Sequence, residues 1–346
     1  MKNFLWDAST GTVTGESVLF RCGIAGKLLR TPERILKVYS PLTGEEYLAG
    51  RDYLWNTGSR ELVLLPGSKI PEVEVLSDPS TADGIIYPEK GATLMPRCID
   101  GKVVRLGPPS WYAEHRVEVD YITGETLPEL PSPVRMPEKF IAKLRNGEKT
   151  VITALGDSIT FGWNSTFICD CPPHQKPYLE FAVDDLRRTF NAEIELHNRA
   201  VSSTGVKYGM DIYDQWANDH ADLMVIAYGM NDFIHYTPAE YGKMVMDIIT
   251  AKSKLDPQSE FLLVASMPRN PDWEPEKYVP HAEYAAILHG IAAARPDCCV
   301  ADVNNLWRTV MSEKNYYDMT GNGVNHANDY GHRLYAAVVQ NCFMMH

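Results

Sequence analysis

The chain has 346 residues, a length that predicts two domains or one large one. Hydrophobic residues make up 45% and charged residues 23%, which is ordinary globular usage and excludes wholesale disorder. Lys and Arg total 33 against 45 Asp and Glu, and this negative balance disfavours binding to nucleic acids or anionic membranes.

The first 130 residues contain short β-rich runs with almost no helical periodicity. These runs are SVLFRC, RILKVYS, YLWNT, ELVLL, VVRL and RVEVDYIT. Turn chemistry between them is supplied by Thr43-Gly44, Pro66-Gly67, Asp100-Gly101 and Thr123-Gly124. We predict a small antiparallel domain over residues 1–130, either a β-sandwich or a jelly-roll-like fold.

A proline-rich segment, LPELPSPVRMP, follows the β-rich runs. Such segments are stiff and extended, so we predict a linker with a connecting helix over residues 131–144. An ordered strap across the first domain is the alternative, and it would move the boundary little.

From residue 145 to 346, apolar runs alternate with amphipathic helical patterns. The strand-like runs cover residues 151–155, 193–196, 223–227, 261–265 and 298–303. The helical patterns cover residues 177–190, 241–255, 283–294 and 330–343. This alternation predicts an α/β fold with a parallel sheet covered on both faces. Active sites in such sheets lie at the carboxyl ends of the strands.

Ser158 follows the first of these strands within the motif GDSIT. A serine at this position presents its hydroxyl at the edge of the sheet, where a base can reach it. The preceding glycine permits the tight backbone that the strand exit needs. An ordinary turn with a capping Asp or Ser is the simpler explanation of the motif taken alone.

Two other loops offer groups that can stabilise an oxyanion. Asn231 follows the strand at 223–227 within YGMND, and its side-chain N–H can point at a developing negative charge. The small residues NRAVSSTG at 198–205 can donate backbone N–H groups. A plain turn and a plain loop are the respective alternatives.

The C-terminal segment NGVNHANDYGH contains two histidines. His326 lies on the loop before the final helix and can act as the base for Ser158, whereas His332 falls in the first turns of that helix. Asp329 can cap the helix. A metal site formed by these two histidines and Asp329 would straddle a loop–helix junction, so we expect no metal.

The order of GDS, a small-residue loop, GMND and a C-terminal histidine resembles the SGNH, or GDSL, esterase and lipase superfamily. The resemblance covers about residues 145–346 and implies a three-layer α/β/α, flavodoxin-like domain. It implies Ser158 as nucleophile and His326 as base and acid. It also implies an oxyanion hole that contains Asn231 and the backbone N–H of Ser203.

Two positions depart from the family's pattern. The family usually has glycine where Ser203 aligns, and Gly205 is the rival position for that backbone donor. The family also usually has an aspartate three residues before the histidine, where this chain has Gly323. Either Asp318 or Asp329 replaces that acid, or a backbone carbonyl orients the histidine in a two-residue dyad. We favour the dyad.

A β-rich domain in front of an SGNH-like domain resembles the acetyl esterases of carbohydrate esterase family two. Trp163, Trp273 and Tyr228 are candidates for stacking on a sugar ring, although each of them is more often a core residue. We therefore predict a cofactor-free serine ester hydrolase that removes short acyl groups, such as acetyl, from a carbohydrate. Its partner would be a small-molecule or oligosaccharide ester.

Two other function classes remain open on the sequence. A lipase, lysophospholipase or thioesterase can use the same scaffold, and a carbohydrate-binding protein can carry an inactive SGNH domain. The seven cysteines are too sparse for a disulfide-framed secreted fold, and the N-terminus has no apolar signal core. We expect a cytoplasmic protein with reduced thiols.

Overall fold

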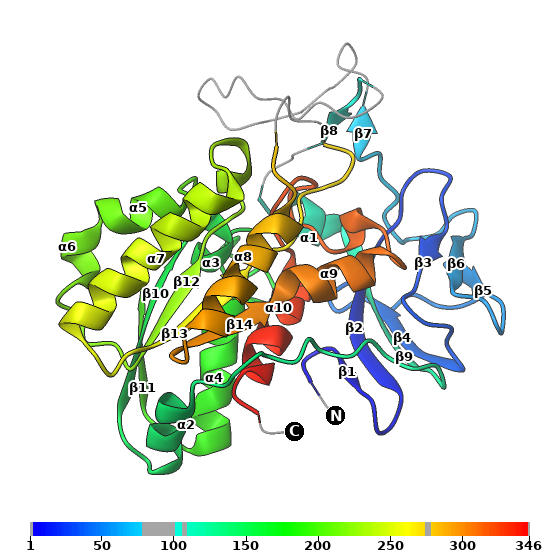
Figure 1. The fold of residues 1–346 in the computed structure, drawn as a ribbon. Coiled ribbons are helices and arrows are strands. Elements are labelled where there is room, and N and C mark those ends of the chain that lie inside the picture. Colours follow the sequence, from blue (N-terminus) through cyan, green and yellow to red (C-terminus); the bar gives the residue numbers. More distant parts are fainter. Residues whose placement is uncertain (1–2, 78–100, 106–108, 274–277, 345–346) are drawn as a thin grey trace.

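The computed structural model describes residues 3–77, 101–105, 109–273 and 278–344. Two architectures lie side by side in Figure 1: a parallel sheet covered by helices, and a group of short antiparallel sheets. Within the described ranges, no helix is long and apolar enough to cross a membrane.

The parallel sheet has five strands in the order β11-β10-β12-β13-β14. This order, with neighbouring pairs all parallel, is that of a flavodoxin-like doubly wound sheet. The strands coincide with the five predicted apolar runs, and they are β10 (Thr150–Gly156), β11 (Ile194–Asn198), β12 (Leu223–Ala227), β13 (Glu260–Ala265) and β14 (Cys298–Asp302).

Side chains alternate between the two faces of this sheet, and each face has its own layer of helices. In β12, Val225 belongs to one hydrophobic cluster and its neighbour Ile226 to the other. One layer consists of α2 (Glu138–Arg145), α4 (Tyr178–Phe190), α9 (Val303–Met311) and α10 (Asp329–Asn341). The other consists of α5 (Val206–Asp211), α6 (Tyr213–Trp216), α7 (Pro238–Leu255) and α8 (His281–Ala294).

The four predicted helices correspond to α4, α7, α8 and α10, so the predicted α/β architecture is confirmed. The described residues also form four short helices: α1 (Trp111–His115), α3 (Ser158–Phe161), η1 (Asp232–Ile234) and η2 (Tyr316–Asp318). The sequence did not predict α9, which begins directly after β14 without an intervening loop.

The N-terminal part contains antiparallel strands in three sheets. A four-stranded sheet has the order β1 (Trp6–Asp7), β2 (Thr12–Leu19), β9 (Arg116–Ile122) and β4 (Arg34–Tyr39). A three-stranded sheet has the order β3 (Gly26–Lys27), β6 (Glu61–Leu64) and β5 (Tyr53–Trp55), and β7 (Leu76–Ser77) pairs with β8 (Val103–Val104). The antiparallel β-rich prediction is confirmed here, whereas a sandwich or jelly-roll arrangement stays a prediction.

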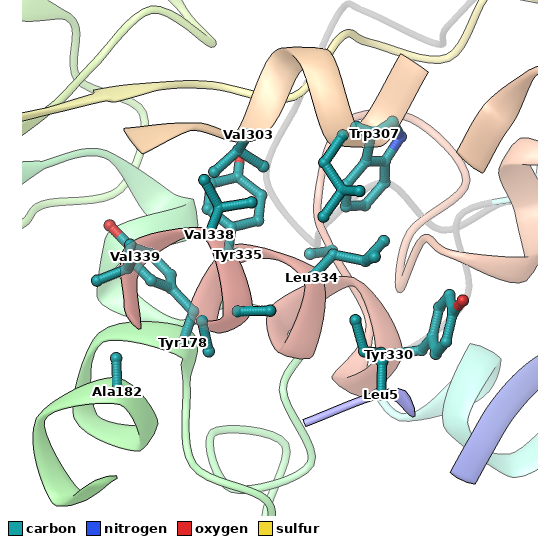
Figure 2. Packing of buried hydrophobic residues seen from close by; sticks show 14 of the residues in the cluster. Leu5, Tyr178, Ala182, Val303, Trp307, Tyr330, Leu334, Tyr335, Val338 and Val339 are labelled. Carbon is teal, nitrogen blue, oxygen red and sulfur yellow. The ribbon is translucent and has the colours of Figure 1, made fainter. Parts of the chain in front are cut away.

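The two parts share one hydrophobic core, and α10 lies at its centre. Figure 2 shows Leu5 from the N-terminal segment beside Tyr330 of α10, with Leu334 and Trp307 further along. Every residue of α10 from Asp329 to Val339 is buried, because α4, α9, strand β14 and strand β2 of the β-rich part all pack against it. The α2 helix overlaps the predicted linker, and the domain limits at residues 130 and 145 stay a prediction.

Candidate active site

The register of the parallel sheet brings three loops to one edge. Gly156 of β10 pairs with Ala227 of β12, and Ala154 pairs with Asn198 of β11, so the segments after all three strands start together. A Cβ atom on Gly156 would lie 2.5 Å from the Oγ1 atom of Thr160. Glycine is therefore required here because the chain turns tightly from the strand into α3.

Ser158 is the first residue of α3 and is buried. The preceding Asp157 caps this helix, since its Oδ1 atom accepts a hydrogen bond from the N–H of Ile159 at 2.9 Å. This cap fixes the turn on which the Ser158 hydroxyl is presented.

The Nε2 atom of His326 lies 2.9 Å from the Oγ atom of Ser158. His326 stands on the loop before α10, and Asn322 organises this loop. The Oδ1 atom of Asn322 accepts backbone N–H bonds from Val324, Asn325 and His326 at 2.9 to 3.0 Å. Serine and histidine thus have the geometry of a nucleophile and its general base.

The other ring nitrogen of His326 contacts Asn164. Its Nδ1 atom lies 2.8 Å from the Oδ1 atom of Asn164, whose Nδ2 group donates to the carbonyl oxygens of Pro109 at 3.0 Å and Gly321 at 2.9 Å. Because both amide hydrogens are used, the oxygen faces the ring as an acceptor. Nδ1 therefore carries the ring proton, and Nε2 is left to accept the proton of Ser158.

Neither acid suggested by the sequence contacts His326. Asp318 accepts the N–H of Leu19 at 2.8 Å and pairs with Lys314 at 3.4 Å. Leu19 belongs to β2 of the β-rich part, and the buried Lys314 also pairs with Glu16 of that strand. Asp318 is therefore a structural residue and not the orienting acid.

Asp329 also has other partners, namely Arg116 at 2.7 Å and Thr166 at 2.8 Å. It does not cap α10 either, because Asn328 holds the cap position and accepts the N–H of Gly331 at 3.0 Å. The favoured backbone-carbonyl dyad is wrong as well, since a side-chain amide orients the histidine.

Asn164 is the site residue that sequence reasoning missed. It lies six residues after Ser158 in a turn and has a φ angle of +64°, a left-handed conformation that asparagine adopts more readily than most residues. Turn chemistry therefore explains an asparagine at this position without any reference to catalysis. Only its tertiary contacts reveal the second role.

Burial, and to a smaller extent the neighbouring His332, lowers the pKa of His326 to about 4. The neutral amide of Asn164 offers no negative charge that would offset this effect. His326 is consequently uncharged at neutral pH, which is the state that a general base needs. Next to Ser158, burial and to a smaller extent the nearby Asp232 raise the pKa of the Asp157 carboxyl to about 7.

The two predicted oxyanion loops contact each other at this edge. Asn231 donates from Nδ2 to the carbonyl of Thr204 at 2.9 Å, and Val201 donates its N–H to the carbonyl of Gly156 at 3.0 Å. One hydrogen of the Asn231 amide thereby holds the loop that carries Ser203. Its second hydrogen has no hydrogen-bond partner among the residues that the structure describes.

Ser203 is exposed and has a φ angle of +63°. This left-handed conformation favours glycine, which gives a physical reason for the glycine that the resemblance leads one to expect there. Gly205 is a glycine for a steric reason, because a Cβ atom there would lie 2.5 Å from the Oδ1 atom of Asp232.

His332 lies inside α10, as predicted, and its hydrogen bonds go to backbone groups and not to Ser158. Its Nδ1 atom accepts the N–H of Tyr178 at 3.4 Å, and its Nε2 atom lies 3.3 Å from the carbonyl of Trp163. Across the described parts of the chain, no three His, Cys, Asp or Glu side chains form a group that could hold a metal ion. Six cysteines are free thiols there, and Cys98 lies outside the described residues.

The three candidate sugar-stacking residues differ in exposure. Tyr228 is only 1% exposed, so its ring cannot stack on a ligand, and that suggestion is wrong. Trp163 is half-buried, donates its indole N–H to the hydroxyl of Ser202, and lies 6.0 Å from the exposed ring of Phe161. Trp273 is half-buried and packs edge-on against Phe233.

The fold is of the doubly wound α/β class, and the Ser–His–Asn array has the geometry of a hydrolase site. The model of the GDSL-like lipase/acylhydrolase family matches residues 154–334, which is more than half of the chain. The chain belongs to this family, and the matched range includes Ser158, Asn164, Asn231 and His326.

Several solved structures of esterases and lipases are similar to this chain at low identity. One is a two-domain esterase (CEX) active on acetylated mannans, 18% identical with a TM-score of 0.47, and the match covers 59% of this chain and 52% of that one. The chain thus spans about half the length of that esterase.

In two further matches, the aligned region covers nearly the whole of the solved protein. A putative GDSL-like lipase from Parabacteroides merdae is 16% identical with a TM-score of 0.47, over 62% of this chain and 99% of that one. An acetyl xylan esterase from Geobacillus stearothermophilus is 18% identical with a TM-score of 0.43, over 56% and 94% respectively. No curated protein matches the chain.

Proposed function

We propose that this protein is a carboxylic ester hydrolase that uses Ser158 as its nucleophile. The observation that carries the proposal is the continuous hydrogen-bonded array from the Ser158 hydroxyl through both nitrogens of His326 to Asn164. The array is comparable to the Cys-His-Asn arrangement of other hydrolases, in which a side-chain amide orients the imidazole.

In the first half of the reaction, the Ser158 oxygen attacks the ester carbonyl carbon, and its proton passes to Nε2 of His326. The resulting tetrahedral intermediate collapses when the C–O bond to the alcohol breaks. The imidazolium returns the proton to the leaving alkoxide, which departs as an alcohol and leaves an acyl-Ser158 ester.

In the second half, water replaces the alcohol. His326 takes a proton from the water, whose oxygen attacks the acyl carbon. The second tetrahedral intermediate then expels the Ser158 oxygen, which recovers its proton from His326. The products are a carboxylic acid and the free enzyme, so protons balance without a metal or cofactor.

Negative charge develops on the carbonyl oxygen in both halves. The free hydrogen of the Asn231 amide and the backbone N–H of Ser203 are the proposed donors for this oxyanion. Their loops are fixed before substrate arrives, because Asn231 already holds Thr204 and the strand edge holds Val201. Such preorganisation is the main source of charge stabilisation in acyl transfer.

We further propose that the acyl group is short, most simply acetyl, and that the alcohol is a carbohydrate. The two-part layout resembles carbohydrate esterase family two. Phe161 is the last residue of the helix that begins at Ser158, and Trp163 follows two residues later, so both rings offer aromatic faces for a sugar ring near the nucleophile.

The test compares a chromogenic acetyl ester with an octanoyl ester of the same alcohol. We expect faster hydrolysis of the acetyl ester, and we expect Ser158→Ala to lose activity by about 10⁵-fold or more with an unchanged melting temperature. Preference for the octanoyl ester would favour a lipase or thioesterase. Activity that survives in the alanine variant would show that Ser158 is a turn residue.

A further inference from the structure

We propose that the β-rich part is a component of the active site, because it positions Asn164 and thereby His326. This inference rests on the proposed function, since it assigns a task to residues that serve the proposed array. Two contacts carry it: a direct one from Pro109 and an indirect one from Arg116.

The direct contact fixes the orientation of the Asn164 amide. The carbonyl of Pro109, in the segment that leads to β9, accepts one amide hydrogen of Asn164 at 3.0 Å. Gly321 accepts the other at 2.9 Å. If the amide turned over, its oxygen would face these two carbonyls and its NH₂ group would face the ring. The proton would then leave Nδ1 for Nε2, and the base would be lost.

The indirect contact fixes the loop that carries Asn164. Arg116 is the first residue of β9, and its Nη2 atom lies 2.7 Å from the Oδ2 atom of Asp329. The same carboxylate accepts the backbone N–H and the hydroxyl of Thr166, both at 2.8 Å. Thr166 follows Asn164 by two residues, so strand β9 and helix α10 hold this loop between them.

Arg116 is required for this arrangement because Asp329 is buried. Both side chains are 1% exposed, and burial of a carboxylate is strongly unfavourable unless a cation compensates it. Arg116 supplies that cation, and the two oxygens of Asp329 accept both hydrogen bonds from Thr166. Arg116 is therefore a positioning residue that acts on His326 through Asp329, Thr166 and Asn164.

The chain offers a matched control for this pair. Arg333 of α10 and Glu118 of β9 form another buried ion pair, at 2.9 Å, between the same helix and the same strand. Arg333 also donates to the carbonyl of Gly15 at 2.6 Å. Its hydrogen bonds go to the β-rich part and not to Thr166 or Asn164. Loss of Arg333 thus removes a comparable bridge without releasing the loop.

The experiment compares Arg116→Met with Arg333→Met. The first readout is the rate at which a fluorophosphonate probe labels Ser158, because this rate reports activation of the nucleophile whatever the natural ester is. We expect both variants to melt at lower temperature. We expect Arg116→Met to label about 10- to 100-fold more slowly, and Arg333→Met to label within about threefold of wild type.

A double-mutant cycle separates positioning from general destabilisation. If Arg116 acts through Asn164, then Arg116→Met adds little to the loss already caused by Asn164→Ala. Equal fractional losses in the wild-type and Asn164→Ala backgrounds would overturn the inference. So would equal losses in the two arginine variants.

Thr166 provides the same test if Arg116→Met does not fold. Thr166→Val removes the hydroxyl donor to Asp329 and should slow labelling about tenfold, whereas Thr166→Ser keeps the hydroxyl and should restore it. No difference between valine and serine would sink the inference. Failure of the wild-type protein to label at Ser158 would instead overturn the proposed function, and the inference with it.

Discussion

The parallel sheet and the β-rich part contribute to the site in different ways. The parallel sheet supplies the proposed reactive groups, because its topology gathers the loops of Ser158, Asn231 and His326 at one edge. The β-rich part supplies buried charges, among them Glu16, Arg116 and Glu118, which face α10 or the segment before it. Sheet topology therefore places the proposed site residues together, whereas packing between the two parts fixes the orientation of the His326 ring.

Buried ion pairs suit the second task. A buried pair adds little net stability, because desolvation offsets the attraction between its charges. Removal of one partner is nevertheless strongly unfavourable, since the other charge stays buried and uncompensated. Such pairs therefore make it energetically unfavourable for the β-rich part to shift relative to the parallel-sheet part. The predictions below test this division, from the largest expected effect to the smallest.

The largest effect should separate the two histidines of the parallel-sheet part. His326→Ala removes the base and should lower kcat by about 10⁵- to 10⁶-fold, as loss of a catalytic histidine does in other serine hydrolases. His332→Gln should stay within about tenfold of wild type, because His332 holds backbone groups and not Ser158. Steady-state kinetics on an acetyl ester checks both. A larger loss of kcat in His332→Gln than in His326→Ala would contradict the proposed role of His326.

Asn164→Ala comes next, since it removes the group that orients the base. We expect kcat to fall by roughly 10²- to 10⁴-fold, up to the value known for loss of the third member of a serine triad. The melting temperature should change far less, because the ring contacts of His326 remain. If kcat falls less than about threefold, the imidazole does not depend on Asn164 for its tautomer.

Asn231→Ala tests the proposed oxyanion donor on the parallel-sheet side. Loss of one such donor lowers kcat by about 10²- to 10³-fold with little change in KM. Asn231 also holds the carbonyl of Thr204, so the variant needs a circular dichroism melt as its control. A loss of activity that simply follows unfolding would make Asn231 a structural residue.

Glu16→Ala tests the structural role of the β-rich part. The buried Lys314 ammonium lies 2.8 Å from Glu16 and would keep only the more distant Asp318, at 3.4 Å, as a carboxylate partner. We expect the free energy of unfolding to fall by about 3 kcal/mol. Denaturant unfolding measures this change, and kcat per folded molecule should be close to wild type. A large selective fall in kcat would mean that this pair, too, serves the site.

The smallest effect concerns pH. His326 works as a base only when neutral, and its pKa of about 4 keeps it neutral well below pH 6. At pH 5.5 we expect nearly full kcat/KM, where a histidine with a pKa of about 6.5 would retain roughly a tenth. Asn164→Asp places a carboxylate beside Nδ1 of His326 and should raise the pKa of the ring. The fall in kcat/KM at low pH should therefore begin at a higher pH than in the wild type. A wild-type limb near pH 6.5 would contradict the burial of this ring.

The sequence by itself predicted the secondary structure of the parallel-sheet part and the residues that we propose for the chemistry. Continuous apolar runs specify strands buried on both faces, and helical periodicity specifies the helices between them. From these elements, the carboxyl ends of β10 and β12 identify Ser158 and Asn231 as candidates. The loop before the last helix identifies His326 in the same way.

Only the tertiary structure decided which group orients His326. Asn164, Asp318 and Asp329 are all polar residues near turns or helix ends, and local patterns do not tell them apart. Their roles depend on contacts between segments more than 100 residues apart, such as Asn164 with His326 and Arg116 with Asp329. Periodicity and turn chemistry describe near neighbours in the chain, whereas burial and ion pairing depend on what the fold brings together.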